Sequence, residues 1–157
     1  MTLRVLVLCT GNSARSQIAE ALLATRGAGR VEAASAGSHP AARVNPYAVD
    51  VLRSHGIRWE EHAPRHVDEV AEAPWDLAIT VCDDAREACP ILPGAAARVH
   101  WGMPDPAAET DPVAAQRAFA ATYDALRTRV DALLALPLAT LSPPELSRRA
   151  QEIHERG

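Results

Sequence analysis

The sequence has few cysteines and few aromatic residues, and each shortage excludes a class of protein. Three cysteines in 157 residues are an odd and small number for a disulfide framework, so their thiols are expected to serve catalysis, redox chemistry or metal binding. Aromatic residues make up only 4% of the chain, and they form no stripe with basic residues that would bind nucleic acid. A net charge of −4 gives no general attraction for polyanions either. We therefore expect no nucleic-acid partner.

Long apolar runs are missing as well. No run reaches the length of a membrane span, and residues 1–4 show neither a basic leader nor an apolar signal core, so we expect a cytoplasmic protein with no membrane partner. The length suits one compact core. We divide the chain into a main domain, residues 1–140, and a helical extension, residues 141–157, because Pro137 interrupts the helical pattern between them.

The most informative segment is an apolar run, residues 3–8, followed by Cys9-Thr10-Gly11-Asn12-Ser13-Ala14-Arg15-Ser16. The residues between Cys9 and Arg15 are small or turn-forming, so their backbone N–H groups can curl around a tetrahedral anion while Arg15 supplies a forked guanidinium. A thiol at the start of a helix meets the positive end of the helix dipole, which favours the thiolate of Cys9. Ser16 can donate its hydroxyl to that sulfur. The segment predicts an oxyanion site with a nucleophile inside it.

Strand and helix patterns alternate along the chain. Strands are expected at residues 3–8, 31–36, 76–82 and 97–101. Helices are expected at residues 16–26, 46–54 after the cap Asn45, 112–136 after the cap Asp111, and 142–154 with a capping box at Ser142. The pattern predicts an α/β fold: a doubly wound, four-stranded parallel sheet flanked by helices, with an extra C-terminal helix.

Three chemically active groups follow the ends of predicted strands. Cys9 directly follows one predicted strand, Cys82 ends another, and Asp105 lies in a proline-flanked loop after a third. Ligands of such sheets bind beyond the carboxyl ends of the strands, so we expect these groups to meet at one site. Asp105 is the candidate general acid for an oxygen that leaves when the thiolate attacks an oxyanion. Asp111, in a second Asp-Pro pair, is interpreted as a helix cap.

The other two cysteines, Cys82 and Cys89, are seven residues apart. In a helix this spacing separates them by about 10.5 Å along the axis. A disulfide needs Cα atoms within roughly 4.4–6.8 Å, so pairing would require the helix to unwind, as in a redox switch. Two thiols packed under a helix are the structural alternative. A zinc site is disfavoured because no Cys-x2-Cys pair is present, and we expect no metal ligands.

Taken together, the loop at residues 9–16, Ser35-Ala36-Gly37, Val81-Cys82 with Cys89-Pro90, and Trp101-Gly102 with Asp105-Pro106 resemble the thioredoxin-coupled arsenate reductases. That family shares the fold of the low-molecular-weight tyrosine phosphatases. The similarity covers residues 3 to about 136. The anion loop is typical of the whole superfamily, whereas the pair of extra cysteines is what points to the reductases.

The resemblance implies a relay of three thiols. Arg15 and the loop would bind arsenate, Cys9 would attack it, and Asp105 would protonate the departing oxygen. Cys82 would then release arsenite. Cys89 would form a disulfide with Cys82, which thioredoxin reduces. Thioredoxin would be an external reductant, with no bound cofactor. Phosphate and sulfate would compete with arsenate as oxyanions.

The resemblance also implies that Asn12, Ser35 and Glu20 brace the loop. Some family members bind potassium near these positions and an acidic residue, for which this chain has Arg65. A guanidinium could replace the cation there. The helix after Ser142 extends beyond the usual end of the family, and docking on the core is its favoured role.

Two other functions compete with arsenate reduction. A phosphatase acting on tyrosine phosphate would need an aromatic wall for the phenyl ring, and here Ala107 and Ala108 follow Pro106 where such enzymes usually carry an aromatic residue. A weak phosphatase side activity is still expected. A non-enzymatic module that binds arsenite or senses redox state would leave Arg15 and Asp105 without a role.

Overall fold

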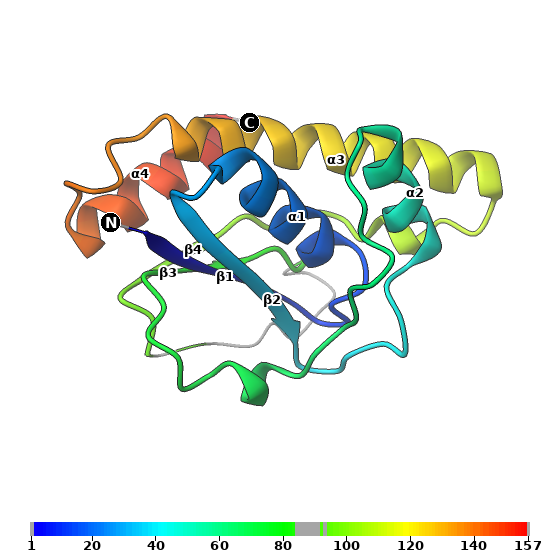
Figure 1. Ribbon diagram of the computed structural model, residues 1–157. Coiled ribbons are helices and arrows are strands. Elements are labelled where there is room, and N and C mark those ends of the chain that lie inside the picture. The colour runs from blue at the N-terminus through cyan, green and yellow to red at the C-terminus, as the bar shows by residue number, and fades with distance from the viewer. Residues whose placement is uncertain (1, 84–91, 93, 157) are drawn as a thin grey trace.

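The computed structural model describes residues 2–83, 92 and 94–156, which form a four-stranded parallel sheet in the order β2-β1-β3-β4 (Figure 1). The strands are β1 (Leu3–Cys9), β2 (Val31–Gly37), β3 (Leu77–Thr80) and β4 (Ala97–His100). The helices are α1 (Arg15–Gly27), α2 (Pro46–Ser54), α3 (Pro112–Leu134) and α4 (Pro143–Arg156), with short 3-10 helices η1 (Val67–Glu69) and η2 (Pro106–Ala108). The predicted fold class is confirmed.

Strand β1 lies in the middle of the sheet, and its sequence explains why. It pairs in parallel with β2 on one side and β3 on the other. Val5 and Val7 pack into the core shared with α1 and α3, whereas Leu6 and Leu8 pack with Trp75 on the opposite face. A strand buried on both faces needs a continuous apolar run, and residues 3–8 supply it.

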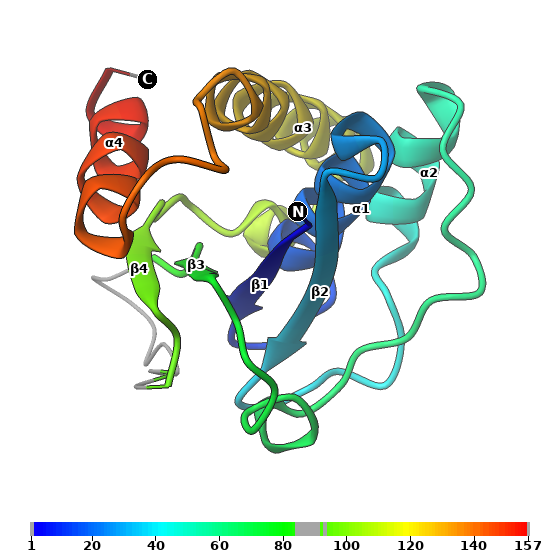
Figure 2. The ribbon, with the colours of Figure 1, turned by 60° about the vertical axis from the view of Figure 1, so that its left-hand side comes forward.

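Helices α1, α2 and α3 lie on one side of the sheet, and α4 lies beside β4 and α3 (Figure 2). Leu146 and Ala150 of α4 are buried in the same core as α3. The indole N–H of Trp101 donates to the carbonyl of Ala150 at 2.9 Å. The extra helix is thus docked on the sheet. None of the helices in the described part of the chain is both long and apolar enough to cross a membrane.

The predicted helix caps are present. Asn45 accepts from the backbone N–H of Tyr47, Asp111 accepts from that of Ala114, and Ser142 forms its capping box with Glu145. The element ends were predicted less well: β3 runs over Leu77–Thr80 and β4 over Ala97–His100, and both are shorter than expected. Helix α3 ends at Leu134, two residues early, and α4 continues to Arg156.

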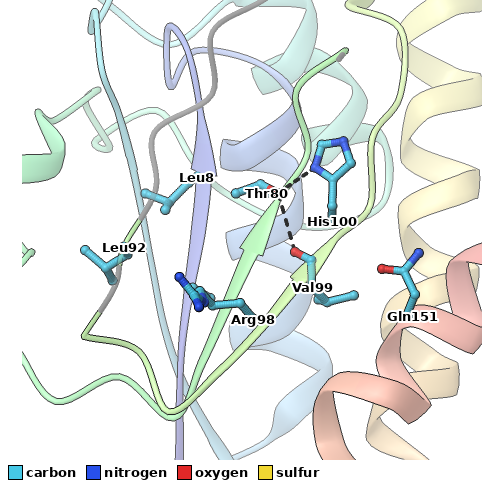
Figure 3. A pocket seen from close by; sticks show the side chains of 8 residues that line it. Leu8, Thr80, Leu92, Arg98, Val99, His100 and Gln151 are labelled. Carbon is cyan, nitrogen blue, oxygen red and sulfur yellow. Dashed lines mark hydrogen bonds between the residues drawn. The ribbon is translucent and has the colours of Figure 1, made fainter. Parts of the chain in front are cut away.

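A cavity of about 250 Å³ lies on the face of the sheet where Leu8 and Ala78 point. Its lining is Leu8, Ala78, Thr80, Leu92, Arg98, Val99, His100 and Gln151 (Figure 3). Thr80 Oγ1 lies 2.6 Å from His100 Nδ1 (Figure 3). Neither Cys9 nor Arg15 lines this cavity, so it is separate from the predicted anion loop.

Candidate active site

The loop between β1 and α1 encloses a second cavity, also of about 250 Å³. Its lining is Cys9, Thr10, Gly11, Ser13, Ala14, Arg15 and Asp105. Cys9 is a free thiol that is only 3% exposed, at the last position of β1, and Arg15 begins α1. The structure therefore brings the predicted nucleophile, the predicted anion-binding residues and the predicted acid to one cavity.

The backbone of the anion loop is held by hydrogen bonds to the segment that follows β2. The carbonyls of Thr10, Gly11 and Ser13 accept hydrogen bonds of 2.8–2.9 Å from backbone N–H groups of residues 39, 41 and 45. Since the C=O and N–H of one peptide point in opposite directions, outward carbonyls turn the intervening N–H groups towards the cavity. An array of inward N–H groups at the start of a helix is a binding site for an anion.

Asn12 keeps the loop in its curled shape. Its backbone is left-handed, with φ of 51°, a conformation that asparagine tolerates better than most residues. Its side-chain amide donates to Ser16 Oγ at 2.8 Å and to Ser35 Oγ at 2.9 Å. Its Oδ1 accepts from the backbone N–H of Arg65 at 3.0 Å and from Gln17 Nε2 at 3.2 Å. Asn12 is fully buried, so it acts on the anion by shaping the loop. Ser16 is likewise fully buried, next to Asn12.

Glu20 anchors this network at its buried end. Ser35 Oγ donates to Glu20 Oε1 at 2.6 Å. Burial raises the pKa of Glu20, while the Ser35 hydrogen bond and the positive charge of Arg65 act in the opposite direction. Ser35 and the backbone N–H of Arg65 already donate to one oxygen each of Glu20 and Asn12. The positive charge of Arg65 also acts on Glu20, and a cation beside it would be repelled.

Arg15 connects the loop to the ends of the other strands. The guanidinium is 3% exposed, and its Nη1 donates to the carbonyl of Met103 at 3.0 Å and to that of Val81 at 3.4 Å. Met103 lies two residues before Asp105, and Val81 lies directly before Cys82. A single side chain of the anion site thus holds the two segments that carry the other reactive groups.

Asp105 lies at the rim of the loop cavity. Its Oδ2 is 3.8 Å from Arg15 Nη2, and its Oδ1 accepts from the backbone N–H of Ala107 at 3.0 Å as the cap of η2. The side chain is 40% exposed, which leaves it able to exchange protons with solvent. This position suits a proton donor to an anion held by Arg15.

Cys82 lies just beyond β3 and is fully buried. Its Sγ is 3.8 Å from Oγ1 of Thr10, the residue after Cys9. Cys82 is disulfide-bonded, in contrast to Cys9. Cys89 and the helix expected around it lie outside the described residues.

Sequence reasoning missed two supports of the loop. Gly37 lies so close to it that a Cβ at this position would come 2.4 Å from the carbonyl oxygen of Thr10. Gln17 bonds the backbone carbonyl of Asn12 at 3.0 Å and accepts from the indole of Trp59 at 2.7 Å. The sequence marked Gly37 as a glycine after a predicted strand and as part of the Ser35-Ala36-Gly37 similarity, but nothing in the spacing linked Trp59 to Gln17.

Comparison with known proteins identifies the family to which this site belongs. The model of the low molecular weight phosphotyrosine protein phosphatases matches residues 4–146. The chain belongs to this family. The matched residues include the anion loop, Cys82 and Asp105, and the resemblance predicted from the motifs is confirmed at this level.

Several members of the phosphatase family similar to this chain are named arsenate reductases. Arsenate reductase 2 of Staphylococcus epidermidis is 38% identical over 100 residues, which cover 64% of this chain and 76% of the relative. A structure of an arsenate reductase in the phosphate binding state is 25% identical, with a TM-score of 0.73 over 85% of this chain and 98% of that one. The thioredoxin-dependent arsenate reductase of Corynebacterium glutamicum is 30% identical, with a TM-score of 0.60 over 80% of this chain and 59% of that one.

Proposed function

We propose that this protein reduces arsenate to arsenite with its three cysteines and is regenerated by thioredoxin. The observation that carries the proposal is the position of Cys82, whose sulfur lies 3.8 Å from the side chain of Thr10, beside the nucleophile Cys9. Hydrolysis of a phosphate ester by Cys9, Arg15 and Asp105 involves no second thiol, whereas reduction of arsenate does. The similar proteins named arsenate reductase support the same assignment.

In the first step the Cys9 thiolate attacks arsenic in an arsenate held by the loop and Arg15. An S–As bond forms and an As–O bond breaks, and the oxygen leaves as water with a proton from Asp105. The inward N–H groups and the guanidinium stabilise the negative charge on the remaining oxygens. The product is an adduct of arsenic(V) on Cys9.

In the second step the Cys82 thiolate attacks Cys9 Sγ. The S–S bond forms as the S–As bond breaks, and the electron pair stays on arsenic, so arsenic(V) becomes arsenic(III) and arsenite leaves. Cys89 then attacks Cys82 and releases the Cys9 thiolate. The resulting Cys82–Cys89 disulfide takes two electrons from the dithiol of thioredoxin. A free Cys9 beside a disulfide-bonded Cys82 supports this order.

The partners follow from this chemistry. Arsenate is the substrate, phosphate and sulfate are competing oxyanions, and thioredoxin is the protein partner. Thiols that must be reduced after every turnover suit a reducing compartment, and we place the activity in the cytoplasm. The reaction needs no bound cofactor beyond the thiols.

Phosphate monoester hydrolysis is a second candidate function, favoured by the loop, Cys9 and Asp105, which are sufficient to attack a phosphate ester. The described lining of the loop cavity includes no aromatic side chain to hold a phenyl ring. After Asp105 and Pro106 the chain continues with the exposed Ala107 and Ala108. We therefore expect this hydrolysis to be slow.

The two functions separate in a comparison of cysteine variants. Cys9→Ser should abolish both arsenate reduction and hydrolysis of p-nitrophenyl phosphate, because a hydroxyl is not ionised by the loop as a thiol is. Cys82→Ser and Cys89→Ser should each stop repeated reduction of arsenate and leave ester hydrolysis largely intact. After one turnover, Cys89→Ser should accumulate a Cys9–Cys82 disulfide visible by mass spectrometry.

Reduction is measured in steady state with thioredoxin, thioredoxin reductase and NADPH, and in parallel with glutathione and glutaredoxin. Faster turnover with thioredoxin is expected. Equal loss of both activities in the Cys82 and Cys89 variants would mean that these residues maintain the fold, and preference for glutaredoxin would refute the thioredoxin coupling.

A further inference from the structure

Two adjoining hollows form a groove along α3 that meets the anion-loop cavity at Asp105. The larger, of about 370 Å³, is lined by Gly102, Met103, Pro104, Asp105, Pro106, Glu109, Ala118, Ala121, Thr122, Ala125 and Arg129. The smaller, of about 280 Å³, is lined by Ala125, Thr128, Arg129, Ala132, Ile153 and Arg156. Both include Ala125 and Arg129, so the groove runs from the Asp105 segment to α4, with Arg129 in the middle.

Arg129 is a buried cation that no anion of the described residues matches. It is 9% exposed, and burial lowers the pKa of its guanidinium. It makes one hydrogen bond, a long one of 3.5 Å from Nη1 to the carbonyl of Trp101, and among the described residues no carboxylate pairs with it. A guanidinium has five N–H donors, and a buried charge is normally paired because its desolvation is costly. The groove therefore presents unused donors at its floor.

Most of the remaining lining is apolar or already bonded, and two acidic side chains lie at one end. Met103, Pro104 and Ala121 offer no polar side-chain atoms, and the hydroxyl of Thr122 donates to the carbonyl of Ala118 at 2.8 Å. At the mouth, Asp105 and Glu109 repel a ligand with additional negative charge. A tetrahedral dianion needs many donors, as the anion loop provides, whereas the buried guanidinium of Arg129 matches one carboxylate. The other arginine in the lining, Arg156, is exposed, and its Nη2 lies 3.7 Å from Oε2 of Glu152.

We propose that this groove binds a small ligand that carries one carboxylate on a compact apolar body, with the carboxylate paired to Arg129. The apolar body lies along the small residues of α3. The groove shares Asp105 with the anion-loop cavity, but neither Cys9 nor Arg15 lines it, and binding to Arg129 does not depend on the proposed reduction of arsenate.

The test is a titration of the full-length, isotope-labelled protein followed by amide chemical shifts. Hexanoate is the probe, hexanamide is its uncharged analogue, and inorganic phosphate is the ligand for the anion loop. Hexanoate should shift the amides of Ala121, Ala125 and Arg129, and phosphate should shift those of Gly11 and Ser13. Hexanamide should bind at least about tenfold more weakly than hexanoate, since it loses a charge-assisted hydrogen bond.

Three variants make the test specific. Arg129→Met should weaken hexanoate binding at least about tenfold, and Ala121→Leu should do so by filling the groove while Arg129 stays in place. Arg127→Met removes an exposed arginine from the same helix and should leave binding unchanged. The spectra themselves show whether each variant is folded. Three results would each overturn the proposal. They are amide shifts of the groove that hexanoate leaves unchanged, binding of hexanoate by Arg129→Met as tight as that by wild type, and groove amides that phosphate shifts in preference to hexanoate.

Discussion

Gly37 offers the sharpest test of how the anion loop is held. A Cβ at this position would lie 2.4 Å from the carbonyl oxygen of Thr10 and 3.0 Å from that of Cys9. The first distance is about 1 Å short of the ordinary contact distance of 3.4 Å. The Thr10 carbonyl cannot simply move aside, because it accepts from the backbone N–H of His39 at 2.9 Å. Gly37→Ala should therefore displace the loop.

The expected effect on activity is large. A displacement of about 1 Å at a catalytic site can cost on the order of 100-fold in rate, and overpacking of this kind destabilises a protein by about 1–3 kcal/mol. Gly37→Ala should thus lower kcat/KM for ester hydrolysis by about 100-fold and also weaken inhibition by phosphate. The losses reflect misplaced N–H groups, since Cys9, Arg15 and Asp105 are all retained.

Activity is measured with p-nitrophenyl phosphate, and stability by thermal unfolding of the same samples. Gly94→Ala is the matched control, because a Cβ at this position meets nothing within 4 Å. It should retain wild-type activity. A Gly37→Ala variant with activity within a factor of about two of wild type would refute the idea that close approach of β2 fixes the loop.

Two further changes test the acid and the buried network. Asp105→Asn should slow the first chemical step by about 100- to 10,000-fold and leave phosphate binding intact. The rate of a single turnover measures this effect. The control is Asp111→Asn, which alters only a helix cap. Glu20→Gln should remove a pH dependence of the free energy of unfolding. Burial raises the pKa of Glu20, so the folded protein holds this proton more tightly than the unfolded chain does. The wild-type protein should therefore lose stability relative to the variant as the pH rises through that pKa. Urea unfolding of both proteins across the acidic to neutral range measures the difference, and parallel pH profiles would contradict it.

Local patterns in the sequence were enough to predict most of the fold. A continuous apolar run marked β1, and the pairs Asn45-Pro46 and Asp111-Pro112 marked the starts of α2 and α3 to the residue. Caps are local signals, because the capping side chain bonds a backbone N–H two or three residues away. The ends of β3 and β4 were not predictable in this way. A strand ends where its neighbours stop pairing, and β3 spans only the four residues that pair with both β1 and β4.

The same distinction between local signals and long-range contacts applies to the residues of the candidate site. The residues that carry chemistry, such as Cys9, Arg15 and Asp105, were recognisable because each belongs to a short motif. The residues that hold them were not, because their contacts join distant parts of the chain. The bond between Trp59 and Gln17 spans 42 positions, and that from Arg15 to Met103 spans 88. No periodicity or spacing records such a contact.

Arg15 shows how much depends on these distant contacts. From the sequence it was expected only to bind an anion, yet its guanidinium also fixes the backbone of Met103 and Val81. The donors that face the cavity and the donors that hold the segments of Asp105 and Cys82 thus belong to one rigid, planar group. Lysine in its place would keep the charge but could not reach both carbonyls and the anion at once. The geometry for anion binding, proton donation and attack by a second thiol is therefore set at a single side chain, at the point where three parallel strands end.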